Sequence, residues 1–302
     1  MTGNLSSKAA WVFPGQGSQR VGMGSELAQA DANARAIFDR VDEALGFNLS
    51  DTIFNGPDED LVATRNQQPA LLATSIAYLE VLRRRGQLPE PTVVAGHSLG
   101  EYTALVASGA LDLADAARLV RRRGELMEEH GLGGMIAVIG LDDSVLAEIA
   151  SASGAEIANI NAPGQTTLSG RAETLERATQ IAKDAGARRV LPLPVNGAFH
   201  SSLMRAVVVG LKPMIDETRF NQPCAPLIAN VDGRLLTEPD DLRVELAAQI
   251  TASVRWVDVV QRAVSEGVDY FVEIGPGKVL SGLIARIAPG STTEQAEALL
   301  RT

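Results

Sequence analysis

The sequence contains a single cysteine, Cys224, among its 302 residues. An intramolecular disulfide is therefore impossible, and such sparing use of cysteine is typical of a reducing compartment. Membrane-spanning runs are lacking too, because no apolar stretch approaches the length that crosses a bilayer. Residues 1–8 do not show the charged and apolar regions of a signal peptide. These absences predict a cytoplasmic protein without a membrane partner.

Positive charge is also in short supply, with 27 Lys and Arg against 37 Asp and Glu and a formal net charge of −10. That balance argues against a nucleic-acid partner. The arginines nevertheless cluster at residues 83–85, 121–123 and 188–189. We interpret most of them as lying on solvated helix faces. A basic rim would also suit an anionic ligand or an acidic protein partner.

The most informative stretch is Gly96-His97-Ser98-Leu99-Gly100, which has the pattern Gly-x-Ser-x-Gly. The apolar run 92–95 before it predicts a buried strand, and the small and apolar residues 101–107 after it predict a helix. A strand, this pattern and a helix together define a nucleophile elbow, in which a sharp turn exposes the serine hydroxyl. Ser98 is therefore predicted to be a nucleophile. The alternative is a glycine-flanked serine in an ordinary turn.

The order of the predicted elements indicates an α/β protein in two parts. A first strand at 10–13 leads into the glycine-rich loop 14–19, whose backbone N–H groups would face a site at the carboxyl ends of parallel strands. This loop lacks the Lys-Ser/Thr of a phosphate-binding P-loop, so we reject a nucleotide site there. Residues 134–195 follow the order strand-helix-strand-strand-helix-strand, which is ferredoxin-like.

The predicted fold class is therefore a parallel-sheet α/β/α core with a nucleophile elbow and a small inserted ferredoxin-like domain. We expect an α/β-hydrolase-like large domain over residues 1–132 and 196–302, and the small domain over 133–195. The remaining elements predicted for the large domain are helices at 25–45, at 70–85 starting from Pro69, at 112–129 and from 202, strands at 227–230 and 270–274, and a final helix from 278.

The predicted helix at 112–129 holds a second informative residue. Leu119, Arg123 and Met127 are spaced i, i+4 and i+8, so they share one face of this helix. Arg123 is therefore expected to point to the interior, where an unpaired guanidinium is costly and needs an anion. Two interpretations stay open here: a structural salt bridge or snorkelling side chain, and a fork that binds a substrate carboxylate.

A general base for Ser98 can be sought by elimination, because the sequence has three histidines. His97 is the neighbour of Ser98, and consecutive residues of a strand point to opposite faces. His130 lies in a glycine-rich helix end. His200 lies in a loop where the chain returns to the large domain, and we prefer it over the alternative of a helix-capping histidine. No acidic residue occurs between 190 and 205, so a backbone carbonyl could orient the imidazole.

Further motifs extend from one end of the chain to the other. They are Phe13-Pro14-Gly15-Gln16-Gly17-Ser18-Gln19, Gln67-Gln68-Pro69-Ala70-Leu71, the elbow with Glu101-Tyr102, Arg123-Gly124-Glu125-Leu126-Met127, Asn161-Ala162-Pro163-Gly164-Gln165, Gly197-Ala198-Phe199-His200-Ser201 and Glu273-Ile274-Gly275-Pro276-Gly277-Lys278-Val279-Leu280. With these motifs in this order, the sequence closely resembles the malonyl-CoA:acyl carrier protein transacylases of bacterial type II fatty acid synthesis.

The resemblance implies a role for each matching position. Ser98 matches the acylated nucleophile, His200 its base, and Arg123 the arginine that pairs with the malonyl carboxylate. Gln16 and Leu99 match the positions whose backbone N–H groups form the oxyanion hole.

Supporting positions follow from the same resemblance. Gln249 matches a glutamine whose main-chain carbonyl orients the histidine, and Gln68 matches another active-site glutamine. Phe199 belongs to a triplet similar to that of malonyl-selecting enzymes, and Asn161 lies in a shared motif. The chain departs from its relatives at residues 252–253, where Ala-Ser replaces the common Asn-Pro.

The implied substrate is a CoA thioester, malonyl-CoA, and the implied partner is an acidic acyl carrier protein that binds transiently. The resemblance implies no permanently bound cofactor, no metal and a monomer. Three alternatives stay open: a trans-acting acyltransferase of polyketide assembly, a serine hydrolase with the same elbow, and a non-catalytic module that binds a carrier protein or acyl-CoA.

Overall fold

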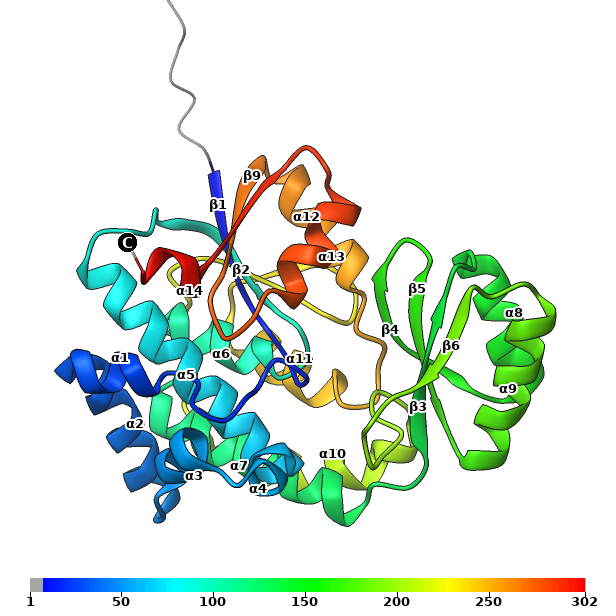
Figure 1. Cartoon of the computed structure of the whole chain (residues 1–302), viewed down its shortest axis with the longest axis horizontal. Helices are drawn as coiled ribbons and strands as arrows, with labels where there is room; N and C mark the ends of the chain where they lie inside the picture. Colours follow the sequence, from blue (N-terminus) through cyan, green and yellow to red (C-terminus); the bar gives the residue numbers. More distant parts are fainter. Residues whose placement is uncertain (1–7, 302) are drawn as a thin grey trace, which may run out of the picture.

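The computed structural model describes residues 8–301, and in that part the chain forms two sheets (Figure 1). The larger sheet has six strands in the order β10-β9-β1-β2-β7-β8. Its neighbours pair in parallel from β10 to β7, and β8 pairs antiparallel with β7. The strands are β1 (Lys8–Phe13), β2 (Pro91–Gly96), β7 (Leu227–Ile228), β8 (Leu235–Leu236), β9 (Val268–Glu273) and β10 (Thr292–Gln295). The predicted parallel-sheet core is confirmed.

Helices cover both faces of this sheet. Along β1, Trp11 and Phe13 join the apolar cluster that includes α5, α6 and α7, whereas Ala10 and Val12 join the cluster that includes α12 and α13. Successive strand residues point to opposite faces, so this alternation produces an α/β/α sandwich. The helices are α1 (Ser25–Ala30), α2 (Ala32–Leu45), α3 (Leu49–Asn55), α4 (Asp58–Val62), α5 (Thr64–Arg84), α6 (Gly100–Ala107), α7 (Leu113–Glu129), a 3-10 turn (Ser202–Met204), α10 (Arg205–Glu217), α11 (Pro239–Ala248), α12 (Trp256–Ser265), α13 (Val279–Ile287) and α14 (Ala296–Leu299).

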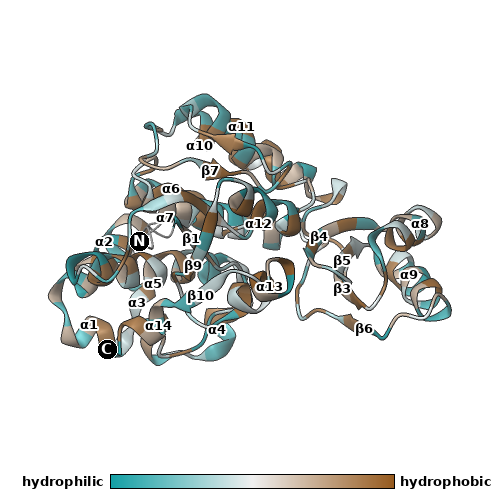
Figure 2. Cartoon of the chain, turned by 90° about the horizontal axis from the view of Figure 1, so that it is seen from above, coloured by the Kyte–Doolittle hydropathy of each residue, from teal (hydrophilic) through white to brown (hydrophobic). Residues whose placement is uncertain are grey.

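The smaller sheet is antiparallel and projects from one side of the molecule (Figures 1 and 2). Its strand order, β4-β5-β3-β6, is that of a ferredoxin-like fold, as predicted. Both of its helices pack on the same apolar cluster as the sheet. The elements are β3 (Gly134–Ile139), α8 (Asp143–Ser153), β4 (Glu156–Ala162), β5 (Gln165–Gly170), α9 (Ala172–Asp184) and β6 (Arg189–Pro192). The domain boundaries at 132/133 and 195/196 stay a prediction.

The predicted start of one helix was wrong. Helix α5 begins at Thr64, and Pro69 lies inside it. Proline has no N–H, so the carbonyl of Arg65, four residues earlier, loses its partner within the helix. The guanidinium of Arg121 on α7 donates to that carbonyl instead, with Nη1 3.4 Å from the oxygen. This contact from a neighbouring helix, which the local sequence does not reveal, accommodates the proline.

Other boundaries also differ from the predictions. The helical segments expected over 25–45 are α1 and α2, which separate where the Asp31 carboxylate accepts hydrogen bonds from the first N–H groups of α2. Strand β6 ends at Pro192, so residues 193–195 are not part of it. Helix α13 is not the last element, since β10 and α14 follow, and β8, α11 and α12 were not predicted. The signal-peptide argument concerns mainly residues 1–7, which lie outside the described residues. None of the helices from residue 8 to 301 is long and apolar enough to cross a membrane.

The elbow has the tight packing that its glycines predict. A Cβ added at Gly96 would lie 1.8 Å from the carbonyl carbon of Gly100, and one at Gly100 would lie 2.1 Å from the carbonyl oxygen of Phe13. Neither obstacle is a flexible side chain, so strand and helix would have to separate to admit a methyl group.

Gly100→Ala should therefore destabilise the protein by about 1–3 kcal/mol or more, the usual range for overpacking. The matched control is Gly282→Ala in α13, where an added Cβ meets nothing within 4 Å. That substitution should be neutral or stabilising by up to about 1 kcal/mol, because alanine favours a helix more than glycine does. Urea unfolding of both variants measures the difference, and equal stabilities would contradict the packing argument.

Candidate active site

Ser98 lies between β2 and α6, in the turn of the elbow. Its φ is 53°, in the left-handed region that residues with a side chain rarely adopt. The side chain of Asn230 holds this turn from both sides, because its Oδ1 accepts from the Ser98 N–H (2.8 Å) and its Nδ2 donates to the Gly96 carbonyl (2.8 Å). Asn230 is fully buried. The Ser98 hydroxyl is thus fixed at the carboxyl end of the parallel sheet.

His200 reaches the same point from a loop about a hundred residues later. Its Nε2 lies 2.8 Å from the Ser98 Oγ. Its Nδ1 lies 2.9 Å from the carbonyl oxygen of Gln249 and 3.2 Å from that of Ala252. Because both of these neighbours are acceptors, the proton of a neutral ring belongs on Nδ1, and Nε2 is left to accept the hydroxyl proton of Ser98.

The loop that carries His200 is held as firmly as the elbow. His200 has a φ of 58°, and it and Ser98 are the non-glycine residues with positive φ between residues 8 and 301. Next to it, Ser169 Oγ donates to the Phe199 carbonyl (2.6 Å) and Ser201 Oγ donates to the Ala198 carbonyl (2.5 Å). Strained backbone of this kind persists where surrounding contacts fix it, and it is concentrated at functional sites.

Arg123 points inward from α7 and is fully buried. Its guanidinium donates to three neutral oxygens: Nη1 to Gln68 Oε1 (2.9 Å), and Nη2 to Ser98 Oγ (2.9 Å) and Gln249 Oε1 (3.0 Å). Among the described residues it forms no ion pair, and its Nε has no hydrogen-bond partner. A structural salt bridge, one of the two interpretations left open by the sequence, is therefore absent. The cation stands next to the serine hydroxyl without a direct anionic partner.

The loop between β1 and α1 packs directly on the elbow. A Cβ at Gly15 would lie 2.5 Å from the carbonyl oxygen of His97. The backbone N–H groups of Gln16 in this loop and of Leu99 in the elbow donate no hydrogen bond within residues 8–301. Two free donors on adjacent segments suit the oxyanion that a carbonyl oxygen becomes when Ser98 Oγ attacks the carbonyl carbon. The side-chain amide of Gln16 donates to Gln67 Oε1.

The electrostatics of the site favour a neutral imidazole. Burial, together with the positive charge of Arg123, lowers the pKa of His200 to about 3, against the smaller opposing effect of the two carbonyls. Burial also lowers the pKa of Arg123, although an arginine starts high enough to stay charged. His200 is therefore neutral at physiological pH and able to accept a proton.

The supporting residues lie at different distances from the centre. Gln68 is fully buried, and its Oε1 faces Arg123. Gln249 contacts more groups than the resemblance implied, because its side chain joins Arg123 and the Ser98 carbonyl while its main chain joins His200. Asn161 contacts His97 and not His200: the Asn161 Oδ1 lies 2.8 Å from the His97 Nε2.

Sequence reasoning did not find Asn230. No motif or periodicity surrounds it, and its contacts join residues more than 130 positions apart. Glu101 directly follows the elbow and belongs to the motif of residues 96–102, but its contacts could not be deduced from the sequence.

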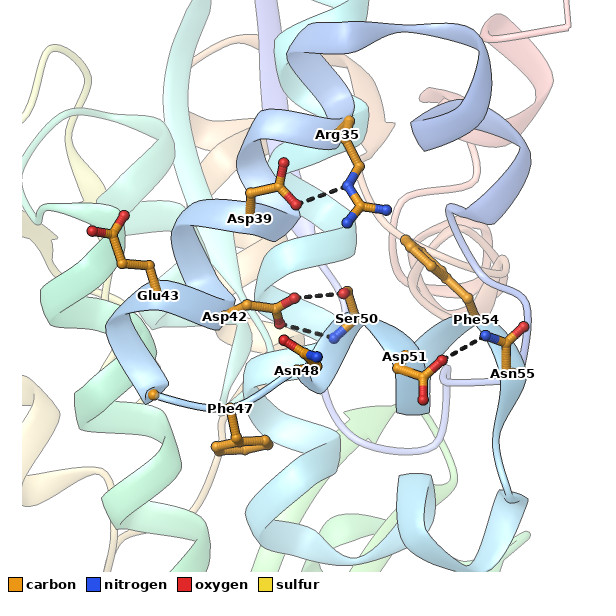
Figure 3. Close-up of a pocket in the computed structure, with 11 residues that line it drawn as sticks. Arg35, Asp39, Asp42, Glu43, Phe47, Asn48, Ser50, Asp51, Phe54 and Asn55 are labelled. Carbon is orange, nitrogen blue, oxygen red and sulfur yellow. Dashed lines mark hydrogen bonds and ion pairs between the residues drawn. The ribbon is translucent and has the colours of Figure 1, made fainter.

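A cavity of about 630 Å3 between α2 and α3 is lined by none of the active-site residues (Figure 3). Its polar groups bond to one another: the Asp42 carboxylate accepts from the Ser50 N–H (2.9 Å) and hydroxyl (2.5 Å), and Arg35 pairs with Asp39. These contacts fix the start of α3 against α2, so we assign the cavity a structural role. No group of three or more His, Cys, Asp or Glu side chains within the described part of the chain could hold a metal ion.

Comparison with known proteins shows the family of the chain. Residues 10–295 match the family model of the acyl transferase domain, which defines the class of the protein. The malonyl CoA-acyl carrier protein transacylase of Bacillus subtilis is 45% identical over 289 residues, which are 93% of this chain and 90% of that protein. The crystal structure of an acyl carrier protein S-malonyltransferase from Vibrio cholerae has a TM-score of 0.93 and 42% identity, covering 96% of both chains. Another similar solved structure is that of a type II PKS acyl-carrier protein in complex with its malonyl-transacylase. It gives a TM-score of 0.91 and 39% identity, with 96% of this chain and 96% of that chain covered. The chain belongs to the malonyl CoA-acyl carrier protein transacylase family.

The lowered pKa of His200 predicts how the reactivity of Ser98 depends on pH. A fluorophosphonate probe, which reacts with activated serines, should label Ser98 at nearly the same rate from pH 5 to pH 7.5. For a histidine with the ordinary pKa of about 6.5, the neutral fraction would fall about thirtyfold as the pH drops from 7.5 to 5. Intact-protein mass spectrometry follows the labelling, and His200→Ala should abolish it throughout. An inflection near pH 6.5 would contradict the assigned environment of the imidazole.

Proposed function

We propose that this protein transfers malonyl from malonyl-CoA to the phosphopantetheine thiol of an acyl carrier protein through a malonyl-Ser98 intermediate, and so supplies fatty acid elongation. One observation carries the proposal: the Ser98 hydroxyl contacts a neutral imidazole and a buried guanidinium without a direct anionic partner at the same time. A base, a nucleophile and a carboxylate-binding group are the three parts that malonyl transfer needs.

In the first half-reaction, Ser98 Oγ attacks the thioester carbonyl carbon while His200 Nε2 takes the hydroxyl proton. The N–H groups of Gln16 and Leu99 stabilise the oxyanion, and removal of one such donor typically raises a barrier by about 3 kcal/mol. The carbonyl re-forms, the C–S bond breaks, and His200 returns the proton to the leaving sulfur. CoA departs as a thiol, and a malonyl ester remains on Ser98.

Arg123 selects the acyl group in this proposal. The malonyl carboxylate takes the place of neutral oxygens around the guanidinium and supplies the missing counter-charge. An acetyl group offers no such anion, so it gains nothing from the buried cation. The hydrogen bond from Arg123 to Ser98 Oγ is then released when substrate binds.

In the second half-reaction, the carrier-protein thiol gives its proton to His200 and its sulfur attacks the ester carbonyl carbon. The bond from that carbon to Ser98 Oγ breaks, His200 returns the proton to Oγ, and malonyl leaves as a thioester of the carrier protein. A free thiol has a pKa of about 8.5, so it needs this help near neutral pH. The complex of a carrier protein with a related malonyl-transacylase supports such a partner. These steps use protein groups and the two thioesters, so we propose no resident cofactor or metal. We also propose a monomer, because Ser98, His200 and Arg123 all come from one chain, and a cytoplasmic location, which suits the exposed thiol of Cys224.

We further propose that residues 1–132 with 196–302, and residues 133–195, are separate domains. The two sheets and their separate apolar clusters support this division.

The nucleophile is tested by mixing the protein with malonyl-CoA and measuring its intact mass. One malonyl group should be added to the parent protein and none to Ser98→Ala. Addition of a holo carrier protein should then remove the malonyl group from the enzyme and add it to the carrier. Rapid loss of the adduct to water without any thiol acceptor would identify a hydrolase instead.

The selectivity is tested with Arg123→Ala. Hydrogen bonds to charged groups contribute about 1.5–3 kcal/mol, so the rate of malonyl loading should fall on the order of ten- to a hundredfold. Acetyl loading should change much less, because the acetyl group has no carboxylate to bind. Arg122→Ala is the matched control, since this neighbour is exposed and pairs with Glu125 on the surface. Equal losses for malonyl and acetyl would refute the assigned role.

A further inference from the structure

Two buried carboxyl groups lie behind the active site and have no part in the mechanism above. Glu101 is on α6, directly after the elbow, and is fully buried; Glu245 is on α11 and is 4% exposed. They accept from consecutive backbone groups: the Asn230 N–H donates to Glu101 Oε1 (2.7 Å), and the Val231 N–H donates to Glu245 Oε1 (3.0 Å). Burial raises the pKa of both groups, and the charge of Glu245 raises that of Glu101 further.

Backbone and side-chain donors face Glu101. It accepts from the Asn230 N–H through Oε1 (2.7 Å) and from Gln249 Nε2 through Oε2 (2.7 Å). The positive charge of Arg123 favours the ionised form of Glu101, whereas burial and the negative charge of Glu245 raise its pKa. Both oxygens of Glu101 are acceptors toward Asn230 and Gln249, whichever of the two carboxyl groups is ionised.

The amide of Gln249 connects Glu101 to the active site. Its Nε2 donates to Glu101, and its Oε1 accepts from Arg123 Nη2. Because Glu101 Oε2 acts as an acceptor, it holds the amide nitrogen of Gln249 on its own side. The oxygen then faces Arg123. If the amide were reversed, its nitrogen would face the donor Nη2 of Arg123, and its oxygen would face the acceptor Oε2 of Glu101.

From this chain of contacts we infer that Glu101 is a positioning residue for malonyl recognition. It fixes the direction of the Gln249 amide, so that the amide oxygen and not the nitrogen faces Arg123. Because Glu101 lies behind the amide, it leaves the guanidinium free to meet a substrate carboxylate. The inference rests on the proposed function.

A matched pair of isosteric variants tests it, with malonyl-CoA and acetyl-CoA as the probes. Glu101→Gln places an amide against the Gln249 amide, so the direction of Gln249 is no longer fixed. The ratio of malonyl to acetyl loading, as kcat/KM, should fall on the order of tenfold, the scale of a weakened charge-assisted contact at Arg123. Glu245→Gln is the matched control, because Glu245 accepts from the Val231 N–H and not from the Gln249 amide, and it should keep this ratio within about threefold of the parent value.

A double-mutant cycle shows whether Glu101 acts through Gln249. Gln249→Met removes the amide but retains the main-chain carbonyl that His200 contacts. If Glu101 acts through the amide, adding Glu101→Gln to Gln249→Met should lower the ratio no further. Where Glu101→Gln does not fold, as judged by thermal melting, Glu101→Asp replaces it. Its shortened carboxylate should still lower the ratio relative to Glu245→Asp.

The outcomes separate this inference from the proposed function. If the parent protein takes no malonyl group on Ser98, the proposed function fails. If the parent is loaded with a preference for malonyl, and the Glu101 and Glu245 variants change that preference equally, the inference fails alone. A purely structural role for Glu101 would reduce malonyl and acetyl loading together and leave their ratio unchanged.

Discussion

A buried cation without a direct anionic partner is the constraint around which this active site is organised. Arg123 is fully buried, and its hydrogen bonds go to the neutral oxygens of Gln68, Ser98 and Gln249. An isolated charge in such a place is expensive, and a carboxylate in direct contact would remove most of that expense. A direct salt bridge would also occupy the guanidinium. The neutral acceptors stabilise the cation by hydrogen bonds and still leave it available to a carboxylate.

The same cation affects the reacting pair. Its charge adds to burial in lowering the pKa of His200, which keeps the imidazole neutral, and its Nη2 donates to the hydroxyl that the imidazole must deprotonate. The first effect keeps the imidazole free to accept a proton, and the second holds the hydroxyl in place before substrate binds. They require the serine, the histidine and the arginine to be held within hydrogen-bond distance, although they come from three distant segments. The left-handed backbone of Ser98 and of His200, each fixed by buried hydrogen bonds, supplies that precision.

Those parts of the structure that local rules govern could be predicted from the sequence. The elbow depends on glycines at fixed positions, the inward direction of Arg123 depends on helical spacing, and the choice of His200 depended on there being few histidines. The contacts of Asn230 and Glu101 could not be predicted, because they join residues more than 120 positions apart without a local pattern. The start of α5 was missed for a similar reason, since Arg121 on another helix satisfies the carbonyl that Pro69 leaves unpaired. Strand β10 and helix α14 are four residues each, too short for periodicity to identify.

Residues 252–253 are Ala-Ser, where the resemblance described above implies Asn-Pro, and the structure shows how this loop is held. His200 uses the carbonyl of Ala252, a group that every residue has. The loop is held against β4 mainly by backbone: the Val254 N–H donates to the Ala158 carbonyl (2.8 Å), and the Ile160 N–H donates to the Val254 carbonyl (2.9 Å). The hydroxyl of Ser253 adds a bond to the Ile157 carbonyl, which ties the loop to the smaller sheet. Because backbone groups orient the imidazole, side chains here can change as long as the path of the chain does not.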